Sequence, residues 1–194
     1  MLTRQTFIGL WAGVPVAWTE QDSFDEDTYR SDVRRCCKAG AAGVYTGGST
    51  GEFYAMDVAE FKAVTRATIE ECHCHCRDAM IGCTSTYTLG AARRAAYAAK
   101  LGADAIQVAL PYWMEVPDDQ VVGFFKEVSA ACGHLPLSIY DNPMSKKALS
   151  VESHRAVKEA LPNYLMVKWV GPRAGRKPED CARLSEFVNP GFPI

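Results

Sequence analysis

Short apolar runs alternate with amphipathic stretches along the whole sequence. The apolar runs are rich in β-branched residues, and we predict a buried strand at residues 13–18, 43–46, 79–83, 105–110, 136–140 and 164–168. The stretches between them favour helices at residues 28–38, 58–72, 90–101, 119–132, 151–161 and 179–188. Suitable N-cap residues precede five of these helices: Asp25, Asp57, Thr88, Asp118 and Ser150. The order indicates an α/β protein made of repeated strand–helix units.

A weak internal repeat supports this interpretation. The sequence KAGAAGV at residues 38–44 is similar to KLGADAI at residues 100–106, about 62 positions later (100 minus 38). Each copy predicts a helix end, a glycine in the left-handed cap conformation and entry into a buried strand. This separation corresponds to two units of roughly 30 residues, the size found in (β/α)8 barrels. A doubly wound open sheet has the same alternation, so both architectures stay open at this point.

Six strand–helix units fit within the 194 residues, and residues 191–194 predict the start of a seventh strand. No linker or low-complexity segment marks a second domain, so we expect residues 1–194 to form a single domain. A closed barrel would need further strands, because an open sheet leaves unpaired backbone groups at its edges.

The composition is that of a soluble globular protein, with 48% hydrophobic and 23% charged residues. A net charge of -2 removes the electrostatic argument for a nucleic-acid or membrane partner, and no apolar run approaches the roughly 20 residues of a membrane span. The apolar run at residues 7–18 contains Gly9, Gly13 and Pro15, so we interpret it as a buried first strand rather than a secretory signal.

Eight cysteines do not follow the spacing of a disulfide scaffold. Four of them fall in predicted helices, where a reduced thiol acts as a small hydrophobic side chain: Cys36, Cys37, Cys132 and Cys181. We therefore expect reduced thiols and a cytoplasmic location.

A glycine-rich turn, GGSTGE at residues 47–52, follows the second predicted strand. Its glycines let the backbone approach a ligand closely, and the hydroxyls of Ser49 and Thr50 can donate hydrogen bonds. Followed by a helix, such a turn suits an anion and particularly a carboxylate. It lacks the lysine of a phosphate-binding P-loop and does not match the dinucleotide fingerprint. The alternative is a tight strand-to-helix turn with no ligand.

A phenol and an amine, those of Tyr140 and Lys168, stand at the ends of neighbouring predicted strands. In a parallel α/β barrel, the site lies at the carboxyl ends of the strands, whose backbones are about 4.8 Å apart. A partly desolvated lysine favours the neutral amine that attacks a carbonyl, and a tyrosine beside it can relay protons. The alternative is that Lys168 extends to solvent and Tyr140 packs at the rim.

Four motifs occur together in the order and spacing of one known family. They are the turn at residues 47–52, Pro111-Tyr112, the sequence IYDNP at residues 139–143, and the apolar strand that ends in Lys168. From about Phe7 to the C-terminus, the chain resembles the dihydrodipicolinate synthase/N-acetylneuraminate lyase family of class I Schiff-base aldolases. The resemblance implies a (β/α)8 TIM barrel, incomplete here, with about six strand–helix units and the start of a seventh strand.

The resemblance also implies a function for each site residue. Lys168 would form an imine with pyruvate or another 2-oxo acid, and Tyr140 would be the general acid and base. Ser49 and Thr50, with the backbone amides of the turn at Gly48, would hold the substrate carboxylate. No metal and no organic cofactor is implied, because the protonated imine itself accepts the electron pair. Members of the family are usually tetramers, so a homo-oligomer is expected.

Two departures from the family pattern bear on the substrate. Dihydrodipicolinate synthases usually carry an arginine shortly after the tyrosine turn and a second tyrosine after Pro-Tyr. This chain has Lys146 and Lys147 at the first place and Trp113 at the second. A lysine cannot reproduce a bidentate guanidinium contact, and tryptophan cannot relay a proton. The departures argue against lysine biosynthesis and leave a sugar-acid aldolase or dehydratase open.

Two further hypotheses come from other classes of protein. The first is a catalytically inactive, truncated barrel that acts only as an oligomerising or partner-binding fragment, because an open barrel exposes apolar edges. The second is a metal-binding protein that uses the run CHCHC at residues 72–76. Zinc sites usually space their ligands in two separated pairs, and side chains at a helix end point in different directions, so we expect no metal there.

Overall fold

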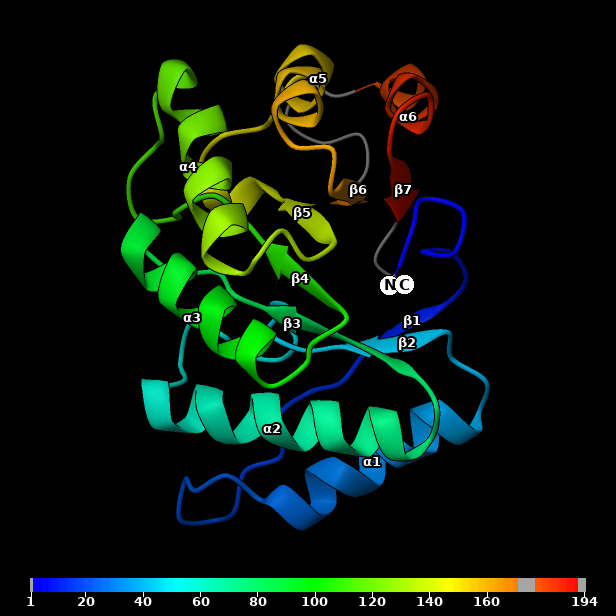
Figure 1. The fold of residues 1–194 in the computed structure, drawn as a ribbon. Coiled ribbons are helices and arrows are strands. Elements are labelled where there is room, and N and C mark those ends of the chain that lie inside the picture. Colours follow the sequence, from blue (N-terminus) through cyan, green and yellow to red (C-terminus); the bar gives the residue numbers. More distant parts are fainter. Residues whose placement is uncertain (1, 171–176, 192–194) are drawn as a thin grey trace.

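The computed structural model describes residues 2–170 and 177–191. Within them, strands and helices alternate along the chain (Figure 1). The strands are β1 (Trp11–Gly13), β2 (Gly43–Tyr45), β3 (Asp78–Gly82), β4 (Ala105–Val108), β5 (Leu137–Asp141), β6 (Tyr164–Trp169) and β7 (Asn189–Gly191). The helices are α1 (Glu26–Lys38), α2 (Val58–Cys74), α3 (Thr88–Lys100), α4 (Asp118–Ala131), α5 (Val151–Ala160) and α6 (Pro178–Ser185), with a short 3-10 helix η1 (Pro143–Ser145).

The seven strands form one parallel sheet in chain order, from β1 to β7. The six α-helices lie outside the strands as an arc, which is open on the side where β1 and β7 lie (Figure 1). Strict sequence order with helices on the outer face is the arrangement of a (β/α) barrel, because a doubly wound sheet would reverse its strand order. The sheet therefore decides between the two architectures that the alternation of elements left open.

Local signals predicted most of the helices correctly. Asp25, Asp57 and Ser150 each accept a hydrogen bond from a backbone amide in the first turn of the following helix. Gly40 and Gly102 have φ values of +92° and +88°, so both copies of the internal repeat end a helix with a left-handed glycine. In the part of the chain that the structure describes, no helix is long and apolar enough to cross a bilayer.

Two N-cap predictions were wrong by one residue. Thr88 is the first residue of α3, and its N-cap Tyr87 makes no side-chain cap hydrogen bond. The N-cap of α4 is Pro117, whose extended backbone precedes the helix, so Asp118 lies inside the first turn. There its carboxylate still interacts favourably with the positive end of the helix.

The first and last strands also differ from the prediction. β1 spans Trp11–Gly13 instead of residues 13–18, because Pro15 has no N–H group with which to continue the ladder to β2. β7 begins at Asn189, two residues earlier than expected, and residues 192–194 of that prediction lie outside the described residues.

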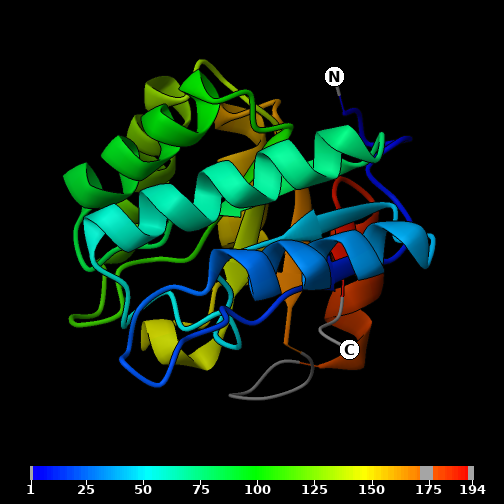
Figure 2. The same cartoon turned by 90° about the horizontal axis from the view of Figure 1, so that it is seen from below.

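The main hydrophobic core lies between the strands and the surrounding helices. Figure 2 shows α1 and α2 side by side in front of β2. The two helices are linked by a buried hydrogen bond of 2.8 Å between the hydroxyl groups of Tyr29 and Thr68. A second, smaller cluster consists of Leu2, Phe7, Met80 and Ala105, with Tyr45 of β2 packed against it.

Candidate active site

The side chain of Lys168 projects from β6 into the concave side of the sheet. Its Nζ atom lies 3.0 Å from the hydroxyl oxygen of Tyr45, which ends β2. These strands are separated by β3, β4 and β5 in the sheet, so their side chains can meet only across the interior. Lys168 is 7% exposed. The alternative that this lysine extends to solvent is therefore excluded.

Tyr140 is the direct partner of Lys168 in the β5–β6 ladder, which confirms that they lie on neighbouring strands, each one residue before the strand end. The Nζ atom lies 4.1 Å from the centroid of the Tyr140 ring and 4.6 Å from that of Tyr45. Burial lowers the pKa of Lys168 below its ordinary value, and the smaller opposing effect of Tyr140 does not cancel this. A lowered pKa increases the fraction of neutral amine at neutral pH.

Ser49 extends this arrangement on the other side of Tyr140. Its Oγ atom lies 3.1 Å from the Tyr140 hydroxyl and 3.9 Å from the sulfur of Met144 in η1. The hydroxyl of Ser49 and the phenol can exchange a proton in either direction, because both groups donate and accept. Ser49 thus links the glycine-rich turn to the hydroxyl of Tyr140, whose ring face lies against Lys168.

The glycine-rich turn lies directly over the amine. A Cβ atom placed on Gly48 would lie 3.5 Å from Nζ of Lys168, so the missing side chain leaves the amine accessible. Gly47 has a φ of +68° and presses against the backbone of Gly82 in β3, where a side chain would clash at 2.8 Å. Only glycine suits this position, which explains the composition of the turn.

Two features of this turn bear on how it could hold an anion. Thr50 is exposed, and its hydroxyl makes no hydrogen bond to the other predicted site residues within the described structure. The next helix, α2, begins at Val58 as the sequence predicts, six residues beyond the turn, and its first amides are already capped by Asp57. The structure therefore gives no support for a helix N-terminus as the anion-binding element.

Tyr45 is the site residue that the sequence reasoning missed. It is the next-to-last residue of the strand predicted at residues 43–46 and the last residue of β2, so an inspection of every strand end could have selected it. Gly13 of β1 makes room for it, because a Cβ atom there would lie 2.5 Å from the Tyr45 hydroxyl. Burial raises the pKa of the Tyr45 phenol above its ordinary value.

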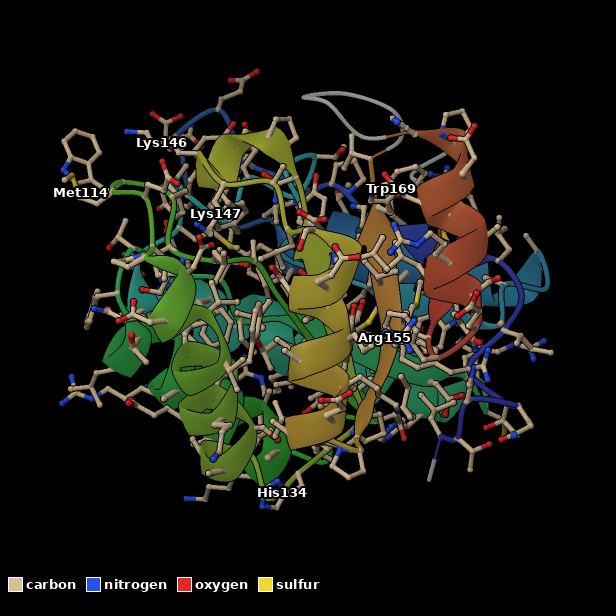
Figure 3. The ribbon with its side chains drawn as sticks, turned by 90° about the horizontal axis from the view of Figure 1, so that it is seen from above. Met114, His134, Lys146, Lys147, Arg155 and Trp169 are labelled. Carbon is tan, nitrogen blue, oxygen red and sulfur yellow. The ribbon has the colours of Figure 1, made fainter. Side chains whose placement is uncertain are left out.

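Lys146 and Lys147 join the loop after β5 to the loop after β4. Nζ of Lys146 donates a 2.6 Å hydrogen bond to the carbonyl of Trp113, and Nζ of Lys147 lies 2.7 Å from a carboxylate oxygen of Asp118. Figure 3 shows both lysines near Met114, at the opposite end of α4 from His134 and so at the carboxyl ends of the strands. Their ammonium groups are engaged in holding the two loops together.

Both histidines of the run at residues 72–76, at the end of α2, are engaged with acidic side chains. His73 pairs with Asp104 at 2.9 Å, and His75 pairs with Glu71 at 3.2 Å, while Cys72 is buried. In the described part of the chain, no three residues of ligand type are grouped closely enough to hold a metal ion.

The chain belongs to the dihydrodipicolinate synthetase family, whose model matches residues 6–171. It is 36% identical over 124 residues to a probable 5-dehydro-4-deoxyglucarate dehydratase of Streptomyces coelicolor, covering 64% of this chain and 38% of that protein. It is 33% identical over 132 residues to a 4-hydroxy-tetrahydrodipicolinate synthase of Methylobacterium radiotolerans, covering 68% and 44%. The chain thus spans less than half the length of these two relatives.

Solved structures share the fold at low sequence identity. The prophage protein YagE of E. coli K12, a member of the same family in complex with pyruvate, matches with a TM-score of 0.88 and 20% identity over 97% of this chain and 64% of that one. A catalytic-lysine mutant of a Ruminococcus gnavus sialic acid aldolase matches with a TM-score of 0.79 and 21% identity over 87% and 55%. These matches confirm the incomplete barrel.

Proposed function

We propose that this protein forms a Schiff base between Lys168 and the carbonyl group of pyruvate or another 2-oxo acid, and that it catalyses a lyase, aldolase or dehydratase reaction on that imine. One observation carries the proposal. A buried lysine with a lowered pKa lies between two phenols at the carboxyl ends of parallel strands. This is the environment in which an amine is both neutral and protected from bulk water.

The neighbouring groups have chemistry that suits each step. The neutral Nζ atom attacks the C2 carbonyl, and the protonated imine then accepts the electron pair left at C3 when a proton or a carbon–carbon bond is lost. Tyr140 acts as general acid and base on the bound substrate, and its contact with Ser49 supplies a second proton carrier. Gly48, Ser49 and Thr50 hold the substrate carboxylate through backbone amides and hydroxyls. The chemistry requires no metal and no organic cofactor.

A 2-oxo sugar acid is the substrate class to test first. The Streptomyces relative is a probable dehydratase of such an acid. The departures at Trp113, Lys146 and Lys147 support the same choice, because they argue against a dihydrodipicolinate synthase. The ammonium groups of the two lysines are already engaged with the neighbouring loop. We expect the protein to act in the cytoplasm, as a single domain and as a homo-oligomer, with a tetramer expected for the full barrel.

A second function, that of an inactive oligomerising or partner-binding fragment, is favoured by the sheet edges. Within the described residues, β1 pairs only with β2, and β7 only with β6. Strand edges of this kind are available for pairing with another chain. A monomeric protein that turns over a 2-oxo acid would exclude this function.

Borohydride reduction in the presence of pyruvate tests the proposal. The imine would be reduced to a stable secondary amine, and peptide mass spectrometry should find it on Lys168. Lys168→Met is the matched control, since it keeps the length of the apolar stem and removes the amine. A wild-type protein that stays unlabelled at Lys168 would contradict the proposed function.

A further inference from the structure

The two phenols beside Lys168 meet its amine in different ways. The Tyr45 hydroxyl lies in hydrogen-bond contact with Nζ, at 3.0 Å. For Tyr140 it is the face of the ring that lies against Nζ, at 4.1 Å, while the hydroxyl is 3.1 Å from Ser49. Within the described structure, Nζ makes no hydrogen bond to the Tyr140 hydroxyl. The two tyrosines are therefore placed for two different proton transfers.

We propose that Tyr45 is a second catalytic acid and base, which handles protons at the Lys168 nitrogen while Tyr140 handles protons on the substrate. This inference rests on the proposed Schiff-base function and assigns one of its steps. It concerns the formation and hydrolysis of the imine, before and after the chemistry at C3.

The proton count of imine formation shows why a separate group is useful. Attack of the neutral amine on the carbonyl carbon forms the C–N bond and leaves two protons on nitrogen. One of these protons passes to the former carbonyl oxygen, and a second proton, from the phenol, completes the water molecule that leaves as the C–O bond breaks. The nitrogen keeps its remaining proton as the protonated imine, and solvent later returns a proton to the phenolate. Tyr45 relays the first proton in one concerted step, giving its own proton to the oxygen while it takes one from the nitrogen. It then donates its proton once more to complete the water molecule and becomes the phenolate.

The surroundings of Tyr45 suit this cycle. Its ring packs against the small apolar cluster of Leu2, Phe7, Met80 and Ala105, which holds the phenol in place. Burial raises the pKa of the free phenol, so that it is protonated and able to act as an acid. When the protonated imine forms, a positive charge develops about 3 Å away and stabilises the transient phenolate.

Selective removal of each hydroxyl separates the two roles. Tyr45→Phe should lower the rate of pyruvate trapping by borohydride about 100-fold, a common contribution of general acid–base catalysis, while the final amount of adduct stays the same. Exchange of the pyruvate C3 protons with deuterium, measured by NMR and divided by the amount of imine, should be unchanged. Tyr140→Phe is the matched control and should show the opposite pattern, with near-normal trapping and exchange lowered about 100-fold.

A probe that leaves the shape of the site intact protects the test against misfolding. With 3-fluorotyrosine in place of Tyr45, the phenol keeps its hydroxyl but has a lower pKa. The trapping rate is measured as a function of pH. The fall of the rate at high pH, which reports ionisation of the phenol, should move to lower pH. The rise of the rate at low pH, which reports deprotonation of Lys168, should stay in place. No movement of the high-pH limb would overturn the inference.

The outcomes distinguish this inference from the function on which it rests. A wild-type protein without adduct at Lys168 contradicts the proposed function itself. A wild-type protein that is trapped at Lys168, with Tyr45→Phe trapped at an equal rate, leaves the function intact and overturns the role of Tyr45.

Discussion

Lys168 and Tyr140 face each other across the β5–β6 ladder, with Nζ 4.1 Å from the centre of the phenol ring. Two opposing effects act on the amine in this position. The ring face attracts the ammonium form, by about 0.5–2 kcal/mol for contacts of this kind. Burial favours the neutral form and is the larger effect, because the pKa of Lys168 is lowered. The charged lysine is therefore a source of instability in the folded protein.

Lys168→Met should abolish imine formation and make the fold more stable at pH 7. The variant removes a partly desolvated charge, and the expected gain is roughly 1 kcal/mol, or about 2–4 °C in Tm for a protein of this size. The folded pKa lies below the unfolded value of about 10.4. Between these two values the unfolded chain binds more protons, so the stability of the wild type rises with pH in that window. Thermal melts at pH 7 and pH 10 should show the difference between the two proteins shrinking at pH 10, and equal Tm values at pH 7 would contradict this.

Gly48→Ala should impair substrate binding with little effect on folding. The added methyl group would lie 3.5 Å from Nζ of Lys168 and 3.1 Å from Cε2 of Tyr45, so it crowds the amine without a backbone clash. We expect the concentration of pyruvate needed for half-maximal trapping to rise roughly tenfold, the equivalent of a modest packing penalty. Gly51→Ala, in the same turn but against backbone atoms only, is the control. An equal effect of both variants would show that the turn, and not access to the amine, is responsible.

A buried network behind Tyr140 should be a major source of stability. The hydroxyl of Tyr164 lies 2.7 Å from Nδ1 of His154, and Nε2 of His154 lies 3.1 Å from a carboxylate oxygen of Asp141. In the neutral tautomer that carries its proton on Nε2, His154 accepts from the phenol at Nδ1 and donates to the carboxylate.

Urea denaturation of two variants tests that arrangement. Tyr164→Phe removes one hydrogen bond and should cost about 1–2 kcal/mol. His154→Leu also removes a donor from a buried carboxylate and should cost roughly 3–5 kcal/mol. Equal losses would show that the contact between His154 and Asp141 contributes little.

Lys147→Met should loosen two loops while leaving global stability nearly unchanged. Asp118 raises the pKa of Lys147, but Asp118 and Glu115 are largely exposed, so each pair contributes at most about 1 kcal/mol. Hydrogen exchange should become faster in residues 111–118 and 142–149. Lys126→Met, at an exposed position of α4, is the control and should leave both segments unaffected. Unchanged exchange in the Lys147 variant would mean that other contacts hold the loops.

The sequence predicted those features that depend on neighbours along the chain. Asp57 caps α2 because a carboxylate three residues before an amide can always reach it. Gly40 and Gly102 end helices because only glycine adopts a positive φ at low cost. The first strand was placed too late because its extent depends on its partner strand, and the ladder stops before Pro15.

The juxtaposition of Tyr140 and Lys168 also followed from the sequence, because successive parallel strands pair side by side and their carboxyl ends then meet. The contact between Tyr45 and Lys168 did not follow. These residues lie 123 positions apart, on strands separated by three others. Their distance depends on the summed twist and curvature of the whole sheet, which no local pattern encodes. The residue pattern determined the order of the strands and the pairing of the Lys168 amine with the phenol of Tyr140. The curvature of the folded sheet decided that Tyr45 is the side chain that meets this amine from across the interior.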